Sequence, residues 1–194
     1  GRMPDDYYEV GEHVIRVRAK DEADFYSPWL EKSFTVVNAV PTVTLTATQT
    51  RTTKDGKFLV NIEAKATDAD GDATTLEYEG RMPDDYYEVG DHIIRVRAKD
   101  EAGFYSPWLE KSFTVVNSDP TVTLTATPTR TIKNGKFFVN VNATVSDTDG
   151  DKTTLEYSGR TADDYYGVGT HTIKVRAKDE SGAYSQWLTK TFTV

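Results

Sequence analysis

The sequence predicts an all-β fold built from antiparallel β-sandwich repeats of 79 residues arranged in tandem. The segment that begins at Gly1 returns at Gly80 and, in altered form, at Gly159, which sets the period. Within one period, short stretches of alternating apolar and polar residues are separated by turn-forming residues, with almost no helical pattern. Several short strands spaced in this way are typical of a sandwich of two sheets.

The first half of each period predicts two strands joined by a tight turn. Residues 41–48 alternate Thr with apolar residues after a proline, which predicts a half-buried strand. Asp55-Gly56 occupies the position of Asn134-Gly135 in the next copy, and both dipeptides favour a hairpin turn. The central core strand is predicted from apolar residues at every second position: Phe58, Val60, Ile62, Ala64 and Ala66, repeated as Phe137, Val139, Val141, Ala143 and Val145.

The second half of each period predicts the closing strands. A polar loop leads to a strand that contains Leu76 and Tyr78, and residues 80–89 are expected to form a longer connection. Ser106-Pro107-Trp108 is expected to open the last strand, which ends at Val115. Between these, alternation predicts a strand with His92, Ile94, Val96 and Ala98 facing the core and Arg95, Arg97 and Lys99 facing water.

Two proline-containing segments, 38–41 and 117–120, predict the linkers, because proline ends the preceding strand. We therefore expect complete sandwiches over residues 39–117 and 118–194, joined by linkers short enough for a semi-rigid rod. Residues 1–38 correspond to the C-terminal half of a preceding sandwich. Open strand edges invite pairing with another chain, so its missing strands are expected from upstream residues of a longer polypeptide or from a neighbouring subunit in a fibre.

Composition narrows the partners and the compartment. The formal net charge of −8 opposes binding to nucleic acid and to anionic membrane surfaces. No apolar run approaches the roughly 20 residues of a membrane-spanning helix, so membrane insertion is not expected. Cysteine is absent, which fits either a reducing compartment or a bacterial exterior, and the strands rich in Thr, Val and Tyr favour the exterior.

One motif has the chemistry of a metal site, an acidic loop in each complete repeat. Oxygen ligands crowded into a tight turn suit a hard cation such as Ca²⁺. No helices flank the loop, unlike an EF-hand, and a polar hairpin turn favours Asp and Gly equally well, so both interpretations stay open. Asp100 and Asp119 are nearby acids that could join the site. The candidate ligands are Asp68, Asp70 and Asp72 in one repeat and Asp147, Asp149 and Asp151 in the next.

No residues in the sequence suggest catalysis. His13, His92 and His171 recur once per repeat without a second ligand or an orienting partner, which indicates packed histidines. Adjacent acids such as Asp84 and Asp85 point to opposite faces of an extended segment and make a poor glycosidase pair. The one aromatic concentration could stack on sugars or cap the end of a small core: Tyr86, Tyr87, Phe104, Tyr105 and Trp108, with equivalents in the other repeats.

The order of these motifs resembles the PKD-like and related Ig-like repeats of bacterial surface proteins. The resemblance lies in the acidic loop at 68–72, the Tyr-x-Val-Gly-x-His pattern that opens residues 87–103, and the closing Phe113-Thr114-Val115. Tyr78-Glu79-Gly80-Arg81 stands where PKD repeats have Trp-Asp-Phe-Gly-Asp-Gly. The resemblance implies sandwiches strung in series in adhesins, S-layer-like proteins or secreted hydrolases. We expect an extracellular spacer, stalk or fibre; the alternative is an array that binds glycans or proteins through its aromatic residues.

Overall fold

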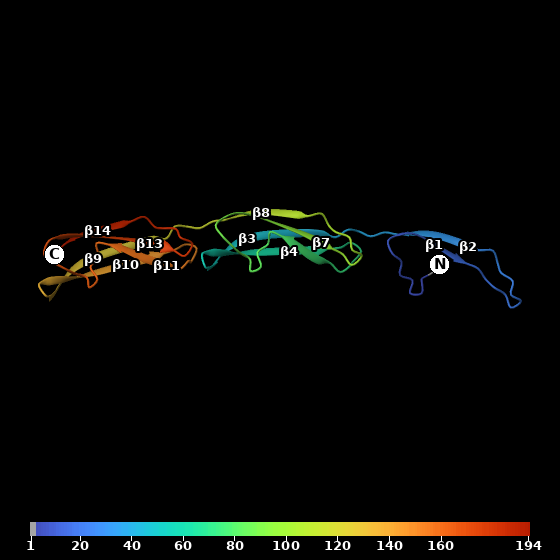
Figure 1. Cartoon of the computed structure of the whole chain (residues 1–194), viewed down its shortest axis with the longest axis horizontal. Coiled ribbons are helices and arrows are strands. Elements are labelled where there is room, and N and C mark those ends of the chain that lie inside the picture. The colour runs from blue at the N-terminus through green and yellow to red at the C-terminus, as the bar shows by residue number, and fades with distance from the viewer. Residues whose placement is uncertain (1–2) are drawn as a thin grey trace. The chain divides into compact units, whose positions relative to one another are not determined.

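The computed structural model describes residues 3–194; residues 1 and 2, which open the predicted first repeat, lie outside this range. Every regular element in the described range is a β-strand (Figure 1). None of the described segments is a helix that could cross a membrane. The all-β class predicted from the sequence is therefore confirmed.

The strands form small antiparallel sheets. One sheet has the order β3 (Thr42–Lys54), β4 (Lys57–Thr67), β6 (Tyr86–Tyr87), and another has the order β5 (Thr75–Glu79), β7 (Gly90–Lys99), β8 (Leu109–Val115). The same orders recur as β9 (Thr121–Lys133), β10 (Lys136–Ser146), β12 (Tyr165–Tyr166) and as β11 (Thr153–Ser158), β13 (Thr170–Asp179), β14 (Leu188–Thr193). β1 (Gly11–Val17) pairs with β2 (Leu30–Val36) in a sheet of two strands.

The chain divides into two compact units. The first contains Gly1–Thr44, Lys65–Glu77 and Val96–Leu109, and the second contains Leu45–Ala64, Tyr78–Arg95 and Glu110–Val194. The first unit therefore holds β1, β2, the acidic loop of the middle repeat and the turn after β7. The second unit holds both apolar clusters.

Each apolar cluster brings two sheets face to face. In the first, Phe58 and Val60 of β4 pack in one cluster with Ile94 of β7 and Val115 of β8, and all four side chains are fully buried. In the second, Val139 of β10 clusters with Ile173 of β13. Two small sheets packed through alternate residues have the layered character of a β-sandwich.

The predicted inward face of β7 is confirmed, since Ile94, Val96 and Ala98 have no exposed surface. Residues 80–89 differ from the prediction, because Tyr86 and Tyr87 form strand β6 and pair with Leu59 and Phe58 of β4. A strand of two residues is too short to give a periodic signal.

The start of the last strand also differs from the prediction, because β8 begins at Leu109 rather than Ser106. Ser106 instead bonds across to β7: its N–H donates to the Ala98 carbonyl at 2.8 Å, and its Oγ accepts from the Ala98 N–H at 2.9 Å. The Ser106 hydroxyl donates in turn to the Pro107 carbonyl at 3.0 Å. These bonds hold the turn after β7 against the strand.

Replacing Ser106 with Ala should lower the free energy of unfolding by about 1–3 kcal/mol, because the buried Ala98 N–H would lose its partner. Ser27 accepts the same bond from the Ala19 N–H at 2.9 Å, but both residues are exposed. Water can replace the lost hydroxyl there, so Ser27→Ala should cost much less. Urea unfolding of the two variants checks this, and equal losses would contradict it.

The hairpin of β1 and β2 is more exposed than the equivalent hairpin of the middle repeat. Val17 is 58% exposed, whereas Val96, its counterpart in β7, is fully buried. Their flanking sequences are almost the same, so the difference comes from what covers the sheet. Completion of this hairpin by upstream residues or by a neighbouring subunit stays a prediction.

Candidate functional site

The acidic loop of the middle repeat connects β4 to β5 and carries the predicted ligands. The Asp68 Oδ1 accepts a hydrogen bond from the Asp70 N–H at 2.8 Å. The side chain of the first acid in the loop therefore closes a tight turn. The Asp70 Oδ2 accepts the N–H of Ala39, a linker residue, at 2.6 Å. Asp70 therefore holds the linker, while Asp68 shapes the loop.

The last repeat reproduces both bonds. The Asp147 Oδ1 accepts the N–H groups of Asp149 and Gly150 at 2.8 and 3.1 Å. The Asp149 Oδ2 accepts the N–H of Ser118 at 2.6 Å. Two copies that differ in linker sequence thus use the middle acid of the loop in the same way.

Asp100 follows β7 directly and lies beside the linker of the middle repeat. It is only 5% exposed. Its Oδ1 accepts the Phe104 N–H at 2.7 Å, and its Oδ2 accepts the Nδ2 of Asn38 at 2.8 Å. The carboxylate is thereby fixed between its own turn and the linker.

Asp179 has the corresponding place in the last repeat and is 4% exposed. Its Oδ1 accepts the Ala183 N–H at 2.7 Å, and its Oδ2 accepts the Nδ2 of Asn117 at 2.8 Å. The sequence named Asp100 only as a nearby acid and did not identify Asn38 or Asn117. Their recurrence at the repeat period beside each proline was the signal that could have found them.

The carboxylates of each site act on one another electrostatically. Burial raises the pKa of Asp72, and the negative charges of Asp68 and Asp100 raise it further. Burial acts to raise the pKa of Asp100 as well, but the hydrogen bonds from Asn38 and Phe104 outweigh it and hold this pKa below its usual range. Asp100 therefore stays ionised next to Asp72.

The same pattern holds in the last repeat. Burial raises the pKa of Asp151, and the charges of Asp147 and Asp179 add to this effect. The nearby Thr53 hydroxyl opposes this rise in the pKa of Asp151. Neither Asp151 oxygen has a hydrogen-bond partner with acceptable geometry. Asp119, the other acid considered from the sequence, is exposed.

The aromatic residues separate into a core group and a surface group. Tyr87 is 2% exposed, lies edge-on against Phe113 at 5.1 Å between ring centroids, and accepts the Met82 N–H at 3.0 Å. His92 packs against both of these rings, and its Nε2 is 2.7 Å from the Glu88 carbonyl oxygen. The prediction of a packed histidine is confirmed for His92.

Arg97 organises the surface group. Its guanidinium lies 4.0 Å from the ring centroid of Tyr105 and 4.6 Å from that of Trp108, and it pairs with Glu77 at 2.7 Å. The side chain is only partly exposed, although the sequence predicted that it faces water. Ring faces that carry a guanidinium are not free to stack on a sugar.

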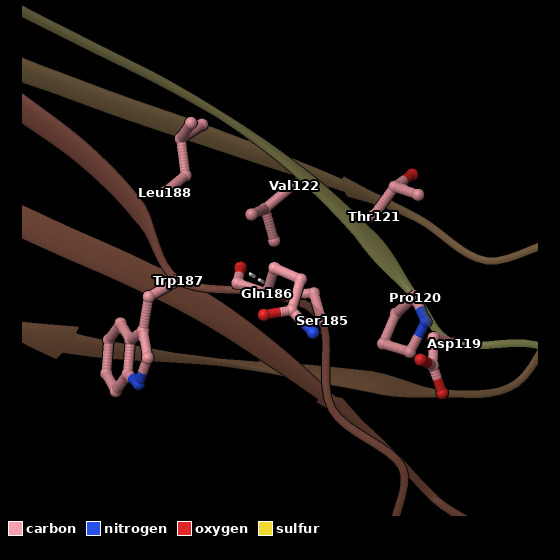
Figure 2. Close-up of a pocket in the computed structure, with 8 residues that line it drawn as sticks. All are labelled: Asp119, Pro120, Thr121, Val122, Ser185, Gln186, Trp187 and Leu188. Carbon is pink, nitrogen blue, oxygen red and sulfur yellow. Dashed lines mark hydrogen bonds between the residues drawn. The ribbon is translucent and has the colours of Figure 1, made fainter.

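A shallow groove lies beside the equivalent surface of the last repeat, between the start of β9 and the turn that precedes β14 (Figure 2). Pro120 and Val122 form one side of it. The indole of Trp187 points away from both of them, and its ring lies 4.8 Å from the Arg176 guanidinium. The groove therefore lacks an aromatic platform that faces a ligand.

The chain matches no protein-family model, and no curated protein is similar enough to count as a relative.

Proposed function

We propose that this chain belongs to the spacer or stalk of an extracellular, bacterial surface protein, in which tandem Ig-like β-sandwich repeats of the PKD-like type stand in series. The observation that carries the proposal is how each linker is attached. Asn38 and Ala39 bond to Asp100 and Asp70, and the equivalent linker residues of the last repeat make the same two bonds. Short linkers that are bonded to the following repeat suit a rod that holds another domain at a distance, and neighbouring repeats are its partners.

We assign the chain no catalytic role. His92 is the side chain best suited to proton transfer, and it packs against Tyr87 and Phe113. The stack of Arg97 on Trp108 recurs as Arg176 on Trp187. Repeats that preserve such internal contacts suit a spacer that extends a protein rather than an enzyme.

Arrays of different length test the spacer role. Inserting one, two or four further copies of residues 39–117 into the chain should increase its maximum dimension, measured by small-angle X-ray scattering, by a constant amount per copy. A flexible string would instead grow with about the square root of the number of copies. Growth of that second kind would count against a spacer.

The second candidate is an adhesive array. Phe104, Tyr105, Trp108 and Leu109 are each 37–41% exposed around one turn, and every repeat has this turn. A chain that binds a glycan or a protein through these residues should lose that binding when Trp29, Trp108 and Trp187 are all replaced by Ala. Glycan-array binding that survives the triple replacement would exclude the aromatic surface.

A further inference from the structure

The strongest unexplained feature of the molecule is a set of buried oxygens without hydrogen-bond partners. Asp151 is 6% exposed, and neither of its carboxylate oxygens has a partner. Burying an unpaired charge is costly, so such a group calls for a compensating ligand. The complete set within residues 3–194 comprises Asp68 Oδ2, Asn117 Oδ1, Asp147 Oδ2, and Asp151 Oδ1 and Oδ2.

A plain polar turn does not account for these oxygens. The turn uses the Oδ1 atoms of Asp68 and Asp147, and the linker uses the Oδ2 of Asp70 and of Asp149. The partnerless atoms are different ones: the second carboxylate oxygens of Asp68 and Asp147, both oxygens of Asp151 and the amide oxygen of Asn117. Turn formation therefore explains the loop's shape and leaves these buried oxygens without a role.

Four of the five partnerless oxygens belong to the last repeat and its linker, in side chains grouped around the buried Asp151, and Asp68 Oδ2 occupies the place of Asp147 Oδ2 in the middle repeat. In the last repeat, Asp179 is hydrogen-bonded to Asn117, and the charges of Asp147 and Asp179 both act on Asp151. The Asn117 amide donates through its nitrogen, which leaves its carbonyl oxygen buried and available. In the last repeat, three carboxylates and one amide therefore belong to one hydrogen-bonded and electrostatically coupled group beside the linker.

We propose that each complete repeat binds one Ca²⁺ at this point, through Asp68, Asp72, Asp100 and Asn38 in the middle repeat and through Asp147, Asp151, Asp179 and Asn117 in the last. Ca²⁺ accepts six to eight oxygen ligands in flexible geometry, so carboxylates, an amide oxygen and water suit it, whereas Mg²⁺ demands a strict octahedron. Asp70 and Asp149, which the sequence also included among the ligands, each accept a linker N–H through Oδ2.

Among residues 3–194, no group of three or more His, Cys, Asp or Glu side chains is gathered closely enough to hold a metal ion as it stands. Carboxylates repel one another without a cation between them, so closure of the site accompanies binding. Asn38 and Asn117 are linker residues, so the bound ion ties the linker to the repeat. The proposed calcium site depends on these contacts and not on the proposed spacer function.

Calcium titration of the full chain tests the inference. The chelator-treated protein should bind two Ca²⁺ ions per chain by isothermal titration calorimetry at constant ionic strength. Free Ca²⁺ at about a hundred times Kd should raise the midpoint of thermal unfolding by about 10–20 °C, because the ion binds only the folded state. Absence of binding at millimolar CaCl₂ would overturn the inference and leave the spacer proposal intact.

Isosteric variants assign the sites. Asp72→Asn and Asp151→Asn should each reduce the stoichiometry to one ion, and the double variant should bind none. Without Ca²⁺, Asp151→Asn should melt no lower than the parent, since it removes a buried charge that lacks a partner. This second readout separates loss of a ligand from loss of the fold.

Asp119→Asn is the matched control, because Asp119 is an exposed acid beside the same linker. It should keep both ions and the full calcium-dependent rise in melting temperature. Two ions bound by the double variant, or an equal loss of binding in Asp119→Asn, would place the ions elsewhere and overturn the assignment.

Discussion

Replacing Phe58 with Ala should lower the free energy of unfolding of the middle repeat by about 3–5 kcal/mol. Phe58 is fully buried and packs in the cluster that joins β4 to β7 and β8. The substitution removes a large apolar side chain and leaves a cavity between the two sheets. A repeat of 79 residues has a total stability of only about 4–12 kcal/mol, so much of it would be lost.

Tryptophan fluorescence during urea unfolding can measure this loss, because each repeat contains one Trp. With Trp29 and Trp187 replaced by Phe, the signal of Trp108 reports on the middle repeat. Val89→Ala is the control within the same repeat, since Val89 is 51% exposed and its replacement should cost under about 1 kcal/mol. A small effect of Phe58→Ala would mean that the two sheets do not share this core.

Gly80→Ala should be nearly as damaging, for a reason of backbone geometry rather than packing. Gly80 has φ of +74°, and a Cβ added there would lie 2.5 Å from the Ile93 carbonyl oxygen. The left-handed conformation alone costs a residue with a side chain about 1–3 kcal/mol, and the clash with the rigid backbone of β7 adds to it. The same fluorescence experiment should show a lower urea midpoint.

Gly103 provides the matched control for Gly80. It also has positive φ, +94°, but no atom lies within 4 Å of an added Cβ. The first repeat has Asp24 at the equivalent position, with φ of 70°. Gly103→Asp should therefore change the stability by less than about 1 kcal/mol. A loss as large as that of Gly80→Ala would show that close approach to β7 is not the cause.

Alternation of apolar residues predicted most of the fold because each sheet has one buried face. The apolar residues at every second position, Ile94, Val96 and Ala98, correctly predicted which side of β7 faces inward. Strand β6 was missed because its two residues are too few to establish a period, and Tyr87 enters the core through its pairing with Phe58. Such pairing depends on chain folding in space rather than on local pattern.

The candidate site was predicted only in part, because its groups come from three distant segments. Asp68 and Asp72 form a recognisable motif within one loop, whereas Asn38 and Asp100 lie 62 residues apart in sequence and meet through a hydrogen bond. The alternating pattern likewise predicted that Arg97 faces water. Its partial burial arises from Tyr105 and Trp108, which reach back over β7 from the following turn.

The five-residue strand β5 has a consequence for folding specificity. In the chain, β3 and β4 lie between two nearly identical hairpins, β1–β2 before them and β7–β8 after them. Pairing with the earlier hairpin would produce a circular permutant of the same sandwich, a typical misassembly of repetitive chains. β5 follows β4 in the chain, so in the permutant it would pair with β1 as it pairs with β7 in the native sheet, where Tyr78 packs against the apolar cluster. The native and permuted sandwiches therefore contain equivalent strands, and the two hairpins compete for the same β3–β5 segment during folding.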